Sequence, residues 1–288
     1  MQRGEKAGFP RFKGRDRWHS FTFKEYGNGA RVDDGALVLS KIGRIGVHWS
    51  RPVEGTPKTV TISKEADGWY VAISCAEVPC TPLPLTGQET GIDLGLESFA
   101  TLADGGQIAT PRVFRVAEMA LKRAQRRVSR RKQGSHRRRK AVHLLATAHQ
   151  RVQRTRRDFH HKTALVRQYD TVYHEDLRVR NLVQNHSLAK SIADAGWSAF
   201  LAIRTFKAAS AGKRVQAVNP ACTSQACSGC GVIVSKGLSV RWHECPDCGT
   251  SLHRDHNAAL HILRLGQEQS GPGYGPQART QPVGAYVA

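Results

Sequence analysis

Hydrophobic and polar residues alternate in three stretches near the start of the chain. The alternating residues are Phe21 and Phe23, Val60 and Ile62, and Trp69, Val71 and Ile73. A period of two places them on one face of an extended chain and predicts half-buried strands. Asp34-Gly35 and Asp67-Gly68 suit the positive backbone angles of tight hairpins. We therefore predict that residues 1–86 form a β-rich module, a small barrel or curled sheet.

A linker containing Pro and Gly, residues 79–88, separates this module from a second domain that we place at residues 87–266. Outside the basic segment described below, the pattern there predicts four strands and two helices. The strands are the apolar run that carries Asp93, residues 98–102, residues 171–173 with Glu175 at their end, and residues 214–218; the helices span residues 192–211 and 253–265. Residues 267–288, rich in Gly, Pro and Gln, are predicted to be disordered. The fold class is α+β.

Positive charge is concentrated in one segment of the second domain. The chain has a formal net charge of +21, and residues 111–168 contain 19 Lys or Arg but two acids, a net charge of +17. Gly134-Ser135 interrupts the segment, which predicts a hairpin of two basic helices. An apolar stripe is expected to hold it together. The stripe is Val142, Leu145, Val152, Phe159 and Val166.

Solvated helix faces usually mix charges of both signs, so a block this basic predicts contact with nucleic acid. The residues expected to make that contact are Arg126, Arg127, Arg130, Arg131, Lys132, Arg137, Arg138, Arg139 and Lys140. Phosphate contacts carry no sequence information, and DNA and RNA both remain open at this point. The basic start of the chain, residues 11–17, either grips phosphates in the same way or blunts an exposed strand edge.

Two CxxC pairs, Cys227/Cys230 and Cys245/Cys248, are separated by 14 residues. This spacing suits one tetrahedral zinc ion in a ribbon that we place at residues 222–252, with the intervening residues forming a small hairpin. The alternatives are two disulfides or four unrelated thiols, but the chain start has no hydrophobic secretion signal. Cys75, Cys80 and Cys222 are then free thiols. We expect a cytoplasmic, nucleoid-associated protein with no membrane contact.

Three acids, Asp93, Glu175 and Asp255, fall at two strand ends and a helix start. Two of them have ordinary explanations: Asp93 can be a structural acid paired with an arginine, and Asp255 can cap its helix. If the three converge, they predict a site for two Mg2+ ions about 4 Å apart, which suits hydrolysis of a phosphodiester.

The ordered motifs resemble the TnpB or OrfB family of bacterial insertion sequences, which are related to RNA-guided nucleases. GIDLGLESFATLADG, YDTVYHEDLRVRNLV and HRDHNAALHIL resemble the three motifs of a RuvC nuclease, with TSQACSGCG and ECPDCG as an inserted zinc ribbon. The resemblance implies an N-terminal wedge module and an RNase H-like domain. It also implies DNA cleavage guided by an RNA from the element's end, with Asp93, Glu175 and Asp255 as Mg2+ ligands.

Two departures from the family pattern are visible. The chain starts almost at PRFKG, so it resembles an N-terminally shortened member, and His253 stands where the family commonly has an acid. The sequence therefore leaves two alternatives to a nuclease open: a catalytically silent nucleic-acid-binding regulator, or a truncated remnant. It does not indicate the oligomeric state.

Overall fold

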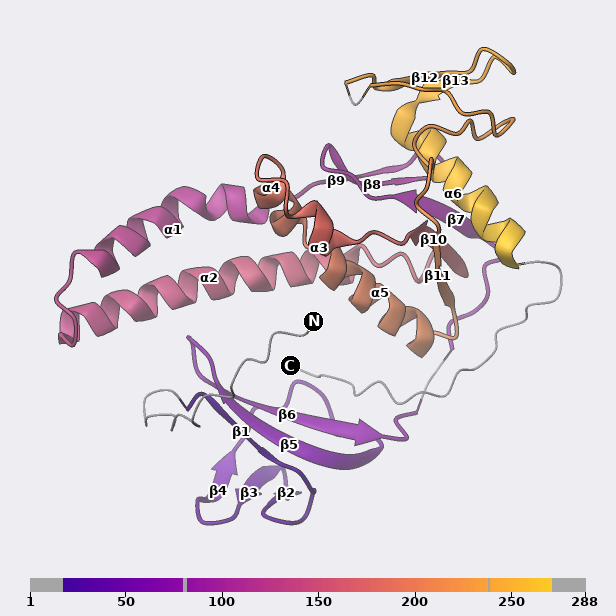
Figure 1. Ribbon diagram of the computed structural model, residues 1–288. Helices are drawn as coiled ribbons and strands as arrows, with labels where there is room; N and C mark the ends of the chain where they lie inside the picture. Colours follow the sequence, from indigo (N-terminus) through magenta and orange to yellow (C-terminus); the bar gives the residue numbers. More distant parts are fainter. Residues whose placement is uncertain (1–17, 80–81, 238, 271–288) are drawn as a thin grey trace, which may run out of the picture. The chain divides into compact units, whose positions relative to one another are not determined.

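The computed structural model describes residues 18–79, 82–237 and 239–270. The chain forms two compact units, and the first ends at Pro79 (Figure 1). The predicted boundary at residue 86 is wrong because residues 83–87 bond to the second unit. Leu83 N donates to Ala211 O at 3.0 Å, and Gly87 N donates to the Asp170 carboxylate at 2.7 Å. The basic start at residues 11–17 and Cys80 lie outside the described residues.

The first unit contains two antiparallel three-stranded sheets, in the orders β1-β5-β6 and β2-β3-β4. The strands are β1 (Ser20–Phe23), β2 (Ala30–Asp33), β3 (Ala36–Leu39), β4 (Gly43–Gly46), β5 (Thr56–Lys64) and β6 (Trp69–Ala76). The alternating residues of β1, β5 and β6 were predicted correctly, whereas β2 to β4 were missed. Among residues 18–79 the strands do not pair into one closed barrel.

Two hairpin predictions in this unit have different outcomes. Asp34 and Gly35 have φ angles of 44° and 69°, as the two-residue turn between β2 and β3 requires. Asp67-Gly68 does not adopt positive angles, because the register pairs Lys64 with Trp69 and leaves a longer loop of ordinary backbone between them. The core between the sheets is apolar. It consists of Ala30, Leu37, Leu39, Val60, Ile62 and Ile73.

A five-stranded sheet of order β11-β10-β7-β8-β9 organises the second unit. Its strands are β7 (Glu89–Asp93), β8 (Ser98–Leu102), β9 (Gln107–Ala109), β10 (Thr171–Glu175) and β11 (Arg214–Val218), and a separate pair is formed by β12 (Trp242–Glu244) and β13 (Ser251–His253). β10 runs parallel to both β7 and β11, while β8 is antiparallel to both of its neighbours, β7 and β9. The predicted strands are all present.

Helices cover both faces of this sheet. The α-helices are α1 (Val113–Ser129), α2 (His136–Lys162), α3 (Val179–Leu182), α4 (Ala189–Ala195), α5 (Trp197–Ser210) and α6 (Arg254–Ser270). Ile92 and Val172 point to one face, where they pack in a core with Phe200 of α5. The next residue along β10, Tyr173, points to the other face and packs with Ile262 of α6.

The contact between α6 and the sheet is unusually close. A Cβ atom at Gly91 would lie 2.2 Å from Ala259 O, and one at Gly266 would lie 2.0 Å from Tyr173 Cδ1. Glycine is therefore required at both positions, because a methyl group would strike backbone in one case and a buried ring in the other.

Two predicted helix boundaries need correction. The helix expected at residues 192–211 is divided into α4 and α5 by Gly196, whose φ of 67° ends one helix and starts the next. The helix that begins at Arg254 continues to Ser270, so the start of the predicted disordered tail at residue 267 is wrong. Residues 271–288 lie outside the described residues.

The basic helices α1 and α2 pack on each other as a hairpin (Figure 1). The Ser135 hydroxyl accepts the backbone N–H of Arg138 at 3.2 Å and caps the start of α2. Val152 is buried as expected, but Val142 is 45% exposed and Val166 lies beyond the end of α2, so the predicted apolar stripe is correct only in part. In the part of the chain that the structure describes, no helix is both long and apolar enough to span a membrane.

Candidate metal centres and nucleic-acid surface

The ends of two neighbouring parallel strands hold two of the predicted acids. Asp93 is the last residue of β7 and Glu175 the last residue of β10, and the pairing of Ile92 with His174 brings these ends together at one edge of the sheet. Asp255 is the second residue of α6, which crosses β7. The fold thus directs all three acids to one region of the second unit.

The electrostatics of Asp93 reflect this proximity. Burial and, after it, the nearby carboxylates of Glu175 and Asp255 raise the pKa of Asp93 to about 8, while Arg254 opposes them. Burial also raises the pKa of Glu175, against a hydrogen bond from Thr223. A buried group of like charges is costly without a cation to neutralise it. A divalent cation with oxygen ligands fits this need.

His253 contacts the start of α6. Its Nδ1 accepts the backbone N–H of Asp255 at 3.3 Å and lies 4.0 Å from the Asp255 carboxylate. His253, which stands where the resembled family commonly has an acid, is therefore next to Asp255. The His253 ring thus satisfies one of the free N–H groups at the start of α6.

The four cysteines of the two CxxC pairs come together. Their sulfur atoms all lie within 4.8 Å of one another, with Cys227 Sγ 3.6 Å from Cys248 Sγ and Cys230 Sγ 3.5 Å from Cys245 Sγ. A tetrahedral ion with Zn–S bonds of about 2.3 Å places its sulfurs roughly 3.8 Å apart. The four thiols thus fit one zinc ion, and none of the cysteines in the described residues forms a disulfide.

The ligand atoms of these cysteines lie closer together than those of the three acids. Over residues 18–79, 82–237 and 239–270, they are the one set of three or more Cys, His, Asp or Glu side chains whose ligand atoms gather within 4.8 Å. Among the intervening residues that the structure describes, all except residue 238, the predicted hairpin is not found as such. Instead, β12 and β13 flank the second pair, and a bridge from Ala226 to Ile233 flanks the first.

One residue that the sequence did not single out, His243, supports the cysteine cluster. His243 is fully buried, and its Nδ1 contacts the Lys236 ammonium. Burial tends to raise the pKa of Cys227, but the N–H of Cys230 and a hydrogen bond from His243 outweigh it and lower this pKa to about 5. Cys227 is therefore predisposed to the thiolate form that binds metal.

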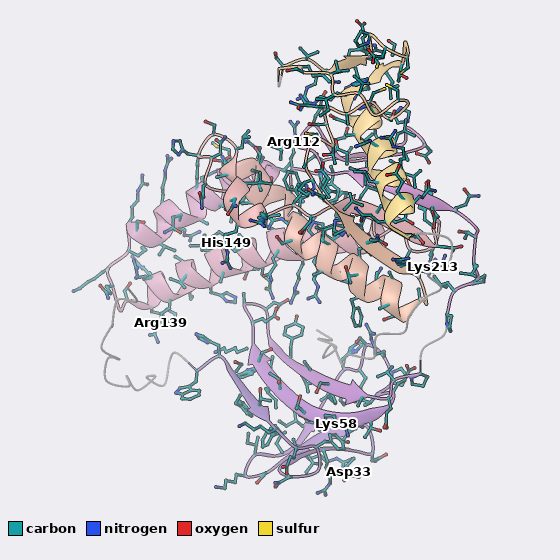
Figure 2. The ribbon with its side chains drawn as sticks, turned by 45° about the vertical axis from the view of Figure 1, so that its right-hand side comes forward. Asp33, Lys58, Arg112, Arg139, His149 and Lys213 are labelled. Carbon is teal, nitrogen blue, oxygen red and sulfur yellow. The ribbon has the colours of Figure 1, made fainter. Side chains whose placement is uncertain are left out.

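Eight of the nine predicted nucleic-acid contacts are exposed, namely all except Arg138. The Arg138 guanidinium donates to Val128 O at 2.8 Å, so it helps to end α1 and is committed to the fold. Arg139 projects from the beginning of α2 near the free end of the hairpin (Figure 2). A hollow of about 480 Å³ is lined by Arg123, Arg126, Arg127, Arg130 and Arg131.

The fold and these sites define a class of protein: a basic, mixed α/β protein in which one unit holds four cysteines that fit a zinc ion and three acids directed to one region. Residues 61–186 match the family OrfB_IS605, described as "Probable transposase", and residues 197–262 match the family "Cas12f1-like, TNB domain".

Two relatives and one solved structure extend this comparison. A "Putative RNA-guided DNA endonuclease" of Streptomyces pristinaespiralis is 38% identical over 97% of this chain and 71% of its own length. The "Putative RNA-guided DNA endonuclease InsQ" of Escherichia coli (strain K12) is 31% identical over 91% of this chain and 69% of its own length. The chain belongs to the OrfB/TnpB family of insertion-sequence proteins. In a cryo-EM structure of a Cas12f1-sgRNA-target DNA complex, the match covers 72% of this chain and 56% of that chain, with a TM-score of 0.45 and 17% identity.

Proposed function

We propose that this protein is an RNA-guided DNA endonuclease that hydrolyses phosphodiester bonds with two Mg2+ ions. The observation that carries the proposal is the placement of the acids: Asp93 and Glu175 end two adjacent parallel strands, and Asp255 lies at the start of the helix that packs on β7. Membership of the OrfB/TnpB family and the names of the two relatives above support the same activity.

Asp93, Glu175 and Asp255 would hold the metal ions through carboxylate oxygens. Bound Mg2+ would activate a water molecule and stabilise the leaving 3′ oxygen of the phosphodiester. Burial and the neighbouring acids raise the pKa of Asp93 and Arg254 opposes this rise, so a bound cation would favour the ionised carboxylate. The sheet that carries two of these acids would have the RNase H-like fold of a RuvC domain, and the first unit would be the wedge module.

The basic hairpin would bind the phosphate backbones of the guide RNA and the target DNA. Its exposed arginines have few acids near them, because Glu118 and Asp158 are its two acids and both are paired with lysines. The four cysteines would hold one structural zinc ion. We place the protein in the bacterial cytoplasm, with its nucleic-acid partners.

Plasmid cleavage tests the proposal. The protein is co-expressed with the RNA from the end of its own element and assayed in Mg2+ and in EDTA, with Asp93→Ala as the variant. Guide-matched cutting that needs Mg2+ and is lost in the variant, with RNA binding retained, is the expected result. Cutting retained in Asp93→Ala would refute the site, and RNA binding without any cutting would favour a regulator.

A further inference from the structure

The segment between β11 and the first CxxC pair contacts β10 and α6, the elements that carry Glu175 and Asp255. It leaves the sheet at Val218, turns at Cys222, whose φ is 61°, and reaches the first cysteine of the cluster at Cys227. Backbone bonds from Gln225 N and Ala226 N to Cys222 O, at 2.9 and 2.8 Å, make this turn compact. Its geometry is therefore set at both ends.

On one side of the segment, Thr223 meets Glu175. Thr223 is 3% exposed, and its hydroxyl donates to Glu175 Oε1 while lying 3.1 Å from Pro220 O. A carboxylate at a strand end has rotational freedom that such a buried donor removes. The hydroxyl thus holds one carboxylate oxygen and leaves the other free for a cation.

On the other side of the segment, Asn257 of α6 forms hydrogen bonds with the backbone on both sides of Cys227. Its amide donates to Ala226 O at 2.8 Å and accepts from Ser228 N at 2.9 Å, and the side chain is fully buried. Asn257 lies two residues after Asp255. The residue on each side of the cysteine is therefore fixed to the helix that carries the third acid.

From these contacts we infer that Thr223 is a positioning residue for Glu175, and that zinc at the cysteine cluster and a divalent cation at the carboxylates bind cooperatively. The inference rests on the proposed function only in taking the carboxylates as a cation site. Bound zinc fixes the position of Cys227, and Cys227 in turn fixes the conformation of the turn that carries Thr223. The Thr223 hydroxyl then sets the orientation of the Glu175 carboxylate. Linkage then requires that a cation at the carboxylates tightens zinc binding by the same factor.

Binding of Mn2+ to the full-length protein without nucleic acid provides the test, because it does not depend on cutting. The variants are Thr223→Val, which keeps the shape and removes the hydroxyl, and Thr223→Ser, which keeps the hydroxyl. Thr205→Val is the matched control, since the Thr205 hydroxyl bonds only a carbonyl within its own helix, Leu201 O at 2.9 Å. Asp93→Asn identifies the Mn2+ signal that belongs to the carboxylates.

We expect Thr223→Val to weaken Mn2+ binding by about 10- to 100-fold, the usual effect of losing a group that orients a metal ligand. Its zinc content should match that of Thr205→Val, and Thr223→Ser should bind Mn2+ nearly as well as the wild type. Unchanged affinity in Thr223→Val, or equal loss in Thr223→Ser, would overturn the positioning role.

Zinc removal tests the coupling itself. Wild-type protein stripped of zinc should lose Mn2+ affinity to a similar extent and regain it when zinc is restored. Equal Mn2+ affinity with and without zinc would overturn the cooperativity. A protein that binds Mn2+ as expected but cuts no guided target would instead refute the proposed endonuclease and leave this inference intact, so the two failures are distinguishable.

Discussion

The Asp170 carboxylate lies 3.1 Å from the ammonium group of Lys213, whose side chain is 1% exposed. The same carboxylate accepts the backbone N–H groups of Thr86 and Gly87 at 2.9 and 2.7 Å. One side chain therefore neutralises a buried lysine and fastens the chain that leads into β7.

Asp170→Asn should destabilise the second unit by about 3 kcal/mol, because it leaves the buried Lys213 charge without its counter-ion. Chemical denaturation followed by circular dichroism measures this change. The double variant Asp170→Asn with Lys213→Met is the control, since it removes both charges. It should recover part of the loss, and a double variant as unstable as the single one would contradict the explanation.

The same pair should contribute to acid sensitivity. Burial opposes ionisation of Asp170, but bonds from Thr86, Lys213 and Gly87 prevail and lower its pKa to about 2. An unfolded aspartate has a pKa of about 3.9. The folded pKa is the lower one, so the stabilisation is present above about pH 4 and is lost as the pH falls toward 2. The stability difference between wild type and Asp170→Asn should shrink over that interval, and a difference independent of pH would argue against it.

Gly91→Ala should destabilise the second unit by about 3 kcal/mol, because the new methyl group would lie 2.2 Å from Ala259 O. Gly237→Ala is the matched control, with only a Ser239 hydroxyl at 3.8 Å from the added Cβ and no positive φ. It should change stability by less than about 0.5 kcal/mol. Thermal melts of the two variants distinguish close packing from a general effect of replacing glycine.

Cys245→Ser should abolish stoichiometric zinc binding, since it removes one of four clustered ligands. Metal analysis of the purified protein measures the zinc content. Cys75→Ser provides the control, because Cys75 lies in β6 of the other unit and is a free thiol. Full zinc content in Cys245→Ser, or its loss in Cys75→Ser, would show that the cluster is not the zinc site.

Neutralising the arginine-lined hollow should reduce the salt dependence of RNA binding. Each phosphate contact contributes about 0.7 to 0.9 to the slope of log affinity against log salt, so replacing Arg126, Arg127, Arg130 and Arg131 by Gln should lower it by about 3. Lys162→Gln should change it by less than the value for one contact, because Asp158 already pairs with Lys162 at 2.6 Å. An unchanged slope in the fourfold variant would remove the hollow from the binding surface.

The parts of the fold that could be predicted are those that neighbouring residues determine. The CxxC pairs fix two cysteines on each turn, and the alternating pattern around Val60 fixes a strand, so both predictions needed no distant contact. The acids at strand ends followed from the strand predictions, although their role as Mg2+ ligands stays a prediction.

What could not be predicted depends on partners far away in the sequence. The residues next to Thr223 in the sequence do not indicate its role, which depends on its hydrogen bond to Glu175, 48 positions earlier. Asn257 is one polar residue on a helix until Ala226 and Ser228 supply its hydrogen bonds. The break at Gly196 could have been suspected from a glycine within an apolar helix pattern, but such a glycine does not by itself end a helix.

The absence of a side chain at Gly91 makes the separation between β7 and α6 a contact of main chain with main chain. Side chains can repack after a substitution, whereas two backbones in contact have almost no room to adjust. The spacing between the strand that ends in Asp93 and the helix that begins beside Asp255 is thus insulated from variation in the surrounding core. Substitutions elsewhere in the core can therefore accumulate without changing the distance between the strand that carries Asp93 and the helix that carries Asp255.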